Sequence, residues 1–196
     1  MKQANVRLRP FKLKDTIEMI QWGKHDDPRF LHYNFPYTKA TDLEKWHRAK
    51  KSFLKKWIYA IYVGNRMVGY ITLKNIKWLD GIGELGIALD PSYVNQGIGK
   101  RAICLYLHRI FRNFPLYEIH LKTAEFNERA IACYEHIGFR HVSKEKEAFE
   151  EQMYRKQILN RFPFFEHDKK KLYVNYCYMK ITKTEFLNKY IKNTEC

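Results

Sequence analysis

A strand, a turn, a glycine-rich loop and the start of a helix follow one another without interruption in residues 85–102. The apolar run LGIAL leads to a turn marked by Pro91, and Gly97 and Gly99 then precede a helical pattern. The two glycines remove β-carbons where the main chain has to pass close to a ligand, and the first turn of a helix offers N–H groups without acceptors. This succession predicts a cradle for phosphate groups and therefore a nucleotide-type cofactor.

Three other interpretations of the loop have to be weighed against this one. A Walker A loop needs glycine at position 94 and serine or threonine at position 101, where this chain has Val94 and Arg101, so it is excluded. Residues 97–102 fit the G-x-G-x-x-A pattern of a dinucleotide fold, with Glu118 about 20 residues further on, although that acid precedes its strand. A plain turn with glycines for tight packing also fits. The last two interpretations stay open on the loop alone.

A second segment, NERAIACYEHIGF at residues 127–139, comes one predicted strand after the loop helix. Together the two segments resemble the GNAT superfamily of acyl-CoA-dependent N-acyltransferases. The family's first motif, Gln/Arg-x-x-Gly-x-Gly/Ala, is matched in its second half by residues 96–99, but Val94 occupies the Gln/Arg position. The second motif, Asn-x-x-Ala/Ser followed by Tyr-Glu-x-x-Gly-Phe, is matched throughout. The resemblance spans residues 6–139 and is greatest to the branch of ribosomal-protein N-terminal and other small-acceptor acetyltransferases.

This resemblance implies the fold. We expect a single α/β (α+β) N-acetyltransferase domain over residues 1–196, with a twisted, mostly antiparallel sheet of about six to seven strands and helices on both faces. The sheet should open between the strands at 83–89 and 117–123, where acyl-CoA inserts. Residues 143–171 are more numerous than expected between the family's last two strands, so an extended C-terminal region from about residue 143 should remodel the acceptor side.

Residue patterns on their own predict the individual elements. The clearest is a β-hairpin of residues 57–63 and 67–73 joined by Gly64 and Asn65. Further strands are predicted at 6–9, 83–89, 117–123, 139–142 and 172–181. Helices are predicted at 14–22, from a cap at Thr41 or Asp42 (with Glu44 in a capping box) to about 54, and at 97–111, 128–136, 144–160 and 183–191. Gly138 is predicted to end the helix at 128–136.

The resemblance also implies a chemistry for two residues. An alkylammonium with a pKa near 10.4 is about three units too protonated at pH 7 to attack a thioester, so its proton has to be removed. Glu84 begins the strand that leads to the glycine loop, where the family often carries a glutamate that receives this proton through water. Tyr134 occupies the family's position for the hydroxyl that protonates the leaving thiolate. Their structural alternatives are a solvent-facing carboxylate and an ordinary packed aromatic ring.

Contacts to acetyl-CoA follow from the same comparison, and none of them involves a metal ion. Ile87, Ala88 and Leu89 should line the acetyl and pantetheine arm, pairing with its amides like an added strand. Backbone N–H groups of the loop should hold the pyrophosphate, with Lys100 or Arg101 near the 3′-phosphate and with Asn127 and Ala130 beside the pantetheine arm. The loop residues in this set are Val94, Asn95, Gln96, Gly97, Ile98, Gly99, Lys100 and Arg101.

Charge and composition bound the partners. Lys and Arg number 36 against 21 Asp and Glu, a net charge of +15 that attracts polyanions and repels polycations. We therefore expect the acceptor to be a peptide or protein N-terminus or a small amine. The residues expected to line its site are Trp22, His25, Asp26, Asp27, Tyr33, Phe35 and Trp46. The alternative is a basic protein that binds nucleic acid or the ribosome on a catalytically silent fold of the same kind, although no nucleic-acid-binding motif accompanies the charge.

Location and assembly are less constrained. No stretch approaches 18 consecutive apolar residues, and the chain starts without an apolar leader segment. We therefore expect a cytoplasmic protein that does not associate with a membrane. The four cysteines are widely separated, with no metal-ligand spacing, which predicts reduced thiols. A monomer and a homodimer are both compatible with the sequence.

Overall fold

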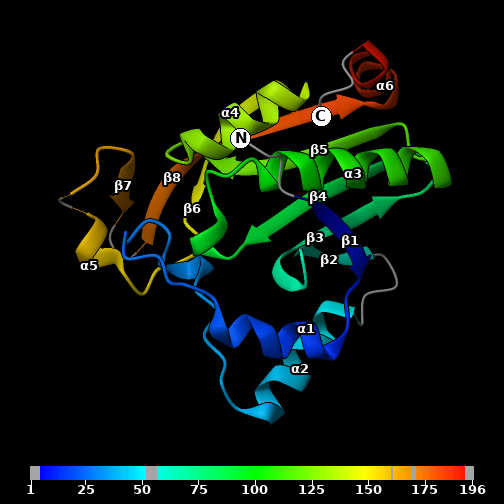
Figure 1. Ribbon diagram of the computed structural model, residues 1–196. Helices are drawn as coiled ribbons and strands as arrows, with labels where there is room; N and C mark the ends of the chain where they lie inside the picture. Colours follow the sequence, from blue (N-terminus) through cyan, green and yellow to red (C-terminus); the bar gives the residue numbers. More distant parts are fainter. Residues whose placement is uncertain (1–4, 52–56, 160, 169–170, 193–196) are drawn as a thin grey trace.

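Eight strands form one sheet in the parts of the chain that the computed structural model describes, residues 5–51, 57–159, 161–168 and 171–192 (Figure 1). Their order is β1-β2-β3-β4-β5-β8-β6, and β7 also pairs with β8. All pairs are antiparallel except β4 with β5. The strands are β1 Val6–Pro10, β2 Trp57–Val63, β3 Arg66–Lys77, β4 Ile82–Leu89, β5 Glu118–Ala124, β6 Arg140–Ala148, β7 Phe165–Asp168 and β8 Lys171–Thr182. The fold class expected from the sequence is therefore confirmed, with one or two strands more.

Helices cover both faces of this sheet (Figure 1). In the view of Figure 1, α1 and α2 lie at the bottom of the picture, away from α3 and α4. The helices are α1 Leu13–Glu18, α2 Ala40–Lys51, α3 Ile98–Asn113, α4 Glu128–Ile137, α5 Arg155–Ile158 and α6 Lys183–Lys192. Single 3₁₀ turns lie at η1 Met19–Gln21, η2 Leu31–Tyr33 and η3 Pro91–Tyr93. No helix in the described ranges has the length and apolarity needed to cross a bilayer.

The main core lies between the sheet and α3. Ile103, Leu107 and Ile110, at helical spacing on α3, are completely or almost completely buried against strand residues such as Ile71 and Leu85. Full burial of each such side chain stabilises the fold by about 2 kcal/mol relative to exposure. Because these residues occupy one face of α3, the helix is held in a fixed orientation over β3 and β4.

A second core lies on the opposite face of the sheet. There Phe11, Met19 and Trp22 pack with Ala60 and Met67 of β2 and β3. A third cluster joins segments that are distant in the sequence, because Phe30 packs against a group formed by Phe126, Phe149 and Phe165. The loop between α1 and α2 is therefore fixed against the segment that follows β6.

The sheet opens where the sequence predicts it. The parallel pair β4 and β5 is in register only from Ile82, opposite Glu118, to Glu84, opposite His120. Beyond that point β4 continues to pair with β3 as far as Leu89, and β5 continues to pair with β8 as far as Ala124. Two strand edges therefore face each other without a ladder between them.

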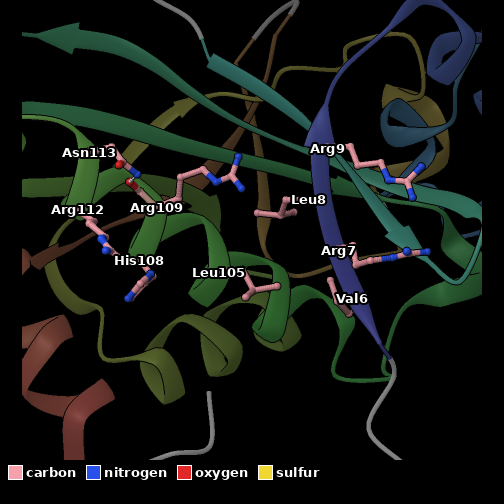
Figure 2. Close-up of a pocket in the computed structure, with 9 residues that line it drawn as sticks. All are labelled: Val6, Arg7, Leu8, Arg9, Leu105, His108, Arg109, Arg112 and Asn113. Carbon is pink, nitrogen blue, oxygen red and sulfur yellow. Dashed lines mark hydrogen bonds between the residues drawn. The ribbon is translucent and has the colours of Figure 1, made fainter.

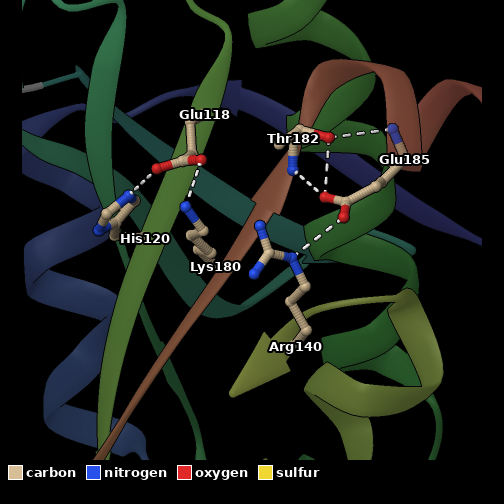
Figure 3. Close-up of polar contacts among 6 residues, drawn as sticks. All are labelled: Glu118, His120, Arg140, Lys180, Thr182 and Glu185. Atoms are coloured by element: carbon tan, nitrogen blue, oxygen red, sulfur yellow. Dashed lines mark hydrogen bonds and ion pairs between the residues drawn. The ribbon is translucent and has the colours of Figure 1, made fainter. Parts of the chain in front are cut away.

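Polar contacts hold the closed end of this opening together (Figure 3). Glu118 accepts hydrogen bonds from His120 and from Lys180 of β8, the latter at 2.8 Å. These bonds outweigh the raising effect of burial and lower the pKa of Glu118. At the start of α6, Thr182 and Glu185 form a reciprocal capping box, and Arg140 donates to Glu185 at 3.1 Å.

The helix predicted over residues 144–160 is wrong. Residues up to Ala148 belong to β6, and only Arg155–Ile158 is helical; Asn160 lies outside the described residues. β6 is an edge strand that pairs only with β8, so charged side chains alternate along it without an apolar face. β7, which the sequence analysis missed, is a four-residue strand that also pairs with β8.

Two smaller expectations are also corrected. α2 begins at Ala40, and Lys39 accepts the N–H groups of Asp42 and Leu43, so Thr41 and Asp42 lie inside the first turn and Glu44 closes no capping box. The helix ends at Lys51, and its predicted continuation to residue 54 falls outside the described residues.

The cysteines are not all alike. Cys133 and Cys177 are free thiols, as expected, whereas Cys104 is disulfide-bonded, so the prediction of reduced thiols is wrong for that residue.

Candidate functional site

The unpaired edge of β4 forms one wall of the site. Ile87, Ala88 and Leu89 lie on the part of β4 that has no β5 partner, and all three are half-buried. Their main chain is held straight from the other side, where they pair with Ile71, Tyr70 and Gly69 of β3. An extended ligand with amide groups can pair with this edge in the manner of an additional strand.

The glycine loop lies at the end of β4 and leads into α3. Gly97 has a φ of +73°, in the left-handed region that favours glycine, and a β-carbon built on it would meet no atom within 4 Å. Its carbonyl accepts the N–H of Arg101 at 3.1 Å. Ile98, Gly99 and Lys100 are the first helical residues, so their N–H groups have no intrahelical acceptor. These donors and the positive end of the helix dipole make an anion site in front of Gly97.

The residues before Gly97 are held by a tight turn. Asn95 has a φ of +62°, and the side chain of Gln96 donates to the Ser92 carbonyl at 3.0 Å. The N–H of Val94 donates to the Pro91 carbonyl at 3.5 Å, closing η3. The expectation that this N–H stays available for phosphate is therefore corrected, because the turn that shapes the loop uses it.

Asp90 anchors this loop, and the sequence analysis did not identify it. Its carboxylate is completely buried and accepts the N–H groups of Gly23 and Ser92, both at 2.9 Å. Arg66 approaches it at 3.4 Å from the exposed side. Asp90 thereby ties the glycine loop to the segment after η1, which leads to the predicted acceptor-lining residues. An aspartate directly before proline at the end of a strand was the available signal.

Asn127 begins α4 across the opening from β4. Its side chain makes no capping hydrogen bond, and its Oδ1 atom is buried without a partner among the described residues. A buried acceptor of this kind costs free energy unless a ligand donor reaches it, so the site fits a ligand with amide N–H groups such as a pantetheine arm. Ala130 lies half-buried one turn later, and its N–H donates to the Asn127 carbonyl at 2.9 Å.

Tyr134 lies near the end of α4, where the helix geometry is fixed. Gly138, with a φ of +118°, donates to the Tyr134 carbonyl at 3.0 Å, which confirms it as the residue that ends the helix. Burial raises the pKa of Tyr134, and the nearby Tyr33 and Cys133 raise it further. Lys100 of α3 lowers the pKa of Cys133 against the larger raising effect of burial. The start of α3 and the end of α4 therefore converge, and Tyr134 stays protonated at neutral pH.

Four tyrosines gather here from four separate elements, and we call Tyr33, Tyr70, Tyr134 and Tyr176 the tyrosine cluster. Burial raises the pKa of Tyr33 and of Tyr70 to about 12 each, and Tyr33 adds to the shifts of the other three. Tyr33 as a whole residue is 42% exposed. Only Tyr33 and Tyr134 were singled out from the sequence. The others are ordinary strand tyrosines by pattern.

Glu84 is the last residue of β4 that pairs with β5. Its carboxylate forms an ion pair with Lys74 at 2.8 Å and accepts a hydrogen bond from Asn75 at 2.7 Å. The Glu84 side chain is 26% exposed, so it is only partly accessible to solvent. Glu84 lies on the face of the sheet opposite the buried Leu85, because neighbouring residues of a strand point to opposite faces. The positive charge of Lys74 compensates its carboxylate.

The predicted acceptor-lining residues separate into two groups. Trp22, Phe35 and Trp46 belong to the cluster around Phe11 and Tyr70, in which Trp22 is buried and Phe35 and Trp46 are half-buried. His25 and Tyr33 lie beside each other near α4, with ring centroids 6.3 Å apart. Asp27 is ion-paired with Arg29 at 2.6 Å, and the charge of the exposed Asp26 acts on His25.

The charges around the tyrosine cluster are few. Glu150 raises the pKa of Tyr33 in addition to burial, and Arg129 acts on it in the opposite direction. Neither Glu150 nor Arg129 has an ion-pair partner among the described residues. The carboxylates on the adjoining sheet face, in contrast, are paired, Glu118 with Lys180 and Glu147 with Lys122 at 3.0 Å. Asp26 and Glu151, which act on the neighbouring His25 and His32, likewise have no ion-pair partner among the described residues.

Comparisons with known proteins agree with this arrangement. The family model described as acetyltransferase (GNAT) domain matches residues 5–140. A comparison with curated protein sequences gives no significant match. Among solved structures, the spermidine N-acetyltransferase from Vibrio cholerae in complex with CoA and spermine has a TM-score of 0.70 at 18% identity, covering 93% of this chain and 98% of its own. A probable acetyltransferase has a TM-score of 0.65 at 20% identity, covering 92% and 94%.

Proposed function

The chain belongs to the GNAT acetyltransferase family, whose cofactor is acetyl-CoA, and on that premise we propose that it acetylates a primary amine by direct attack on the thioester. One observation carries the proposal: β4 and β5 part beyond Glu84, with the N-terminus of α3 and Tyr134 of α4 beside the opening. Family membership favours catalysis over a protein that only binds nucleic acid or the ribosome.

The binding roles divide along the opening. The N–H groups of Ile98, Gly99 and Lys100 would hold the diphosphate of acetyl-CoA, with the side chains of Lys100 and Arg101 close by on the first turn of α3. The edge of β4 from Ile87 to Leu89 would pair with the pantetheine amides, and the Oδ1 atom of Asn127 would accept an N–H from the same arm. Bound acetyl-CoA supplies the activated acyl group.

Two side chains then carry protons. Glu84, which is paired with Lys74, accepts the amine proton through water as the nitrogen attacks the thioester carbonyl carbon. As the carbon–sulfur bond breaks, the Tyr134 hydroxyl donates its proton to the sulfur, and the tyrosine is reprotonated from solvent before the next turnover. The raised pKa of Tyr134 suits a donor that must hold its proton at neutral pH.

Glu84→Gln is expected to lower kcat by about tenfold to 100-fold and to flatten its pH dependence, because the carboxylate that receives the proton is gone. The matched control is Lys74→Gln, which breaks the same ion pair at 2.8 Å but leaves the carboxylate in place. Steady-state rates from pH 6 to 10 distinguish the two. Equal losses in both variants, with the pH profile unchanged, would make Glu84 a purely structural ion-pair partner.

For the acceptor we propose a molecule with a single reactive amine, such as the N-terminus of a peptide or a small monoamine. The solved relatives that are spermidine acetyltransferases suggest a polyamine instead, but they resemble this chain at 18% identity. In this chain Asp27, Glu84, Glu118 and Glu147 are each compensated by a cation of the protein itself. Glu150 acts on the tyrosine cluster without an ion-pair partner among the described residues, whereas the net charge of +15 opposes the approach of a molecule with several ammonium groups.

Glu150→Gln is expected to raise the KM for the acceptor by about tenfold and to leave the KM for acetyl-CoA unchanged, because one attractive charge at the mouth is lost. Glu44→Gln removes an equal charge from the exposed face of α2 and is the control. An acceptor screen that follows thiol release first identifies the working amine. Spermidine as the best acceptor, or an unchanged acceptor KM in Glu150→Gln, would reject the single-amine assignment.

A further inference from the structure

A second cavity lies away from the proposed cofactor site, between the edge strand β1 and the outer flank of α3 (Figure 2). It encloses about 600 Å³, which is in the range of small-molecule sites. Figure 2 shows Arg109 reaching from α3 toward β1, with Leu8 and Leu105 between the two elements. We call it the arginine groove; its lining residues are Val6, Arg7, Leu8, Arg9, Leu105, His108, Arg109, Arg112 and Asn113.

The arginine groove is basic without internal compensation. None of its four arginines has a carboxylate partner among the described residues. Arg7 donates to the Gly64 carbonyl, Arg9 lies 4.9 Å from the ring centroid of Tyr62, and Arg109 lies 4.9 Å from that of Tyr59. Figure 2 shows Arg7 and Arg9 pointing away from α3, on the opposite side of β1 from Leu8, so Arg109 and Arg112 are the guanidinium groups that α3 contributes to the groove. These two like charges, three residues apart on α3, favour binding of an anion.

The groove is distinct from the anion site of the glycine loop. Arg109 and Arg112 belong to the last two turns of α3, whereas Gly99 and Lys100 belong to its first. At 1.5 Å per residue, the axial separation between Lys100 and Arg112 is about 18 Å. Arg109 and Arg112 are both exposed, on the flank opposite the core residues of the helix.

We propose that the arginine groove binds a nucleoside polyphosphate. Guanidinium groups match phosphate oxygens in pairs, and several of them call for a ligand with several adjacent negative charges. The cavity is much larger than a phosphate chain alone requires. Its floor of Val6, Leu8 and Leu105 is apolar and accommodates an uncharged ring such as a base. The polyphosphate lies against Arg109, Arg112 and His108, while Arg7 and Arg9 raise the positive potential along β1.

The test is calorimetric titration with ATP, carried out with saturating coenzyme A so that the glycine loop is already filled. The variant Arg109→Gln/Arg112→Gln should weaken ATP binding by at least about tenfold, since two charge-assisted contacts are lost. The control Lys45→Gln/Arg48→Gln makes the same charge change on the exposed face of α2 and should bind ATP within about twofold of the wild type. Unchanged melting temperatures and acetyl-CoA affinities in both variants establish intact folding.

Two further ligands decide the chemistry. Sodium tripolyphosphate should bind more weakly than ATP, because it leaves the apolar floor empty. Equal affinities for these two ligands, or an ATP affinity that the groove variant does not lower, would overturn the proposal. A single-stranded RNA that binds more tightly than ATP and depends on Arg109 and Arg112 would assign the groove to nucleic acid instead.

Discussion

Tyr134→Phe is expected to lower kcat by about 100-fold to 1,000-fold, the size of effect typical of losing a positioned general acid. The substitution removes one oxygen and keeps the ring, so the contact with Phe139, at 5.9 Å between ring centroids, and the packing of α4 persist. The KM for acetyl-CoA should stay within about twofold, because the hydroxyl acts in the transition state and not in binding.

The matched control for Tyr134 is Tyr33→Phe, which removes a hydroxyl from the same tyrosine cluster. Its effect on kcat should be about tenfold or less, since Tyr33 comes from the acceptor-side loop and not from α4. Single-turnover kinetics, with acetyl-CoA preincubated and acceptor added, isolate the chemical step. Wild-type kcat in Tyr134→Phe, or an equal loss in Tyr33→Phe, would remove Tyr134 from its assigned role.

Asp90→Ala is expected to destabilise the protein by about 3 kcal/mol and to raise the KM for acetyl-CoA at the same time. The buried N–H groups of Gly23 and Ser92 would both lose their acceptor, and Arg66 would lose its ion-pair partner. Because Asp90 joins the glycine loop to the segment after η1, one substitution should loosen both sides of the site. Urea unfolding measures the first effect and steady-state kinetics the second.

Asp90→Asn provides the control for this substitution, because it retains an oxygen acceptor for Gly23 and Ser92 and loses only the negative charge. It should therefore be less destabilised than Asp90→Ala. If Asp90→Ala unfolds at the wild-type urea midpoint, the buried carboxylate is not the anchor described here.

The order of elements from β1 to α4 could be predicted from the sequence because local signals and tertiary packing agree there. Gly64 lies in the hairpin turn, Gly97 precedes α3 and Gly138 ends α4, each with a positive φ that favours glycine. The apolar spacing of Ile103, Leu107 and Ile110 matches the buried face of α3. These residues predicted the elements, whereas the opening between β4 and β5 was expected from the resemblance to the GNAT superfamily.

Residues 143–168 could not be predicted in the same way, whereas the strand at 172–181 and the helix at 183–191 were predicted and are β8 and α6. Residues 144–148 are mostly charged, and nothing local shows that they form an edge strand, since their pairing partner, β8, lies about 30 residues later. The packing of Phe149 and Phe165 against Phe30 likewise depends on contacts far apart in the sequence. Residues 144–148 were therefore assigned to a helix, although their pairing with β8 makes them part of a strand.

The site was predictable to the extent that a motif marks it. Gly97 precedes α3, Asn127 precedes α4 and Tyr134 lies within α4, as the motifs predict, while their roles remain proposals. Asp90 and the strand tyrosines of the tyrosine cluster were missed. Their roles depend on burial, and burial cannot be read from the sequence.

The most direct test of this account is a calorimetric titration of the wild-type protein with coenzyme A, compared with pantetheine, which lacks the diphosphate. Free N–H groups at the start of α3 should give coenzyme A a micromolar dissociation constant and make pantetheine at least about 100-fold weaker. Millimolar or weaker binding of coenzyme A, or equal affinities for the two ligands, would contradict the assignment of the glycine loop to the diphosphate.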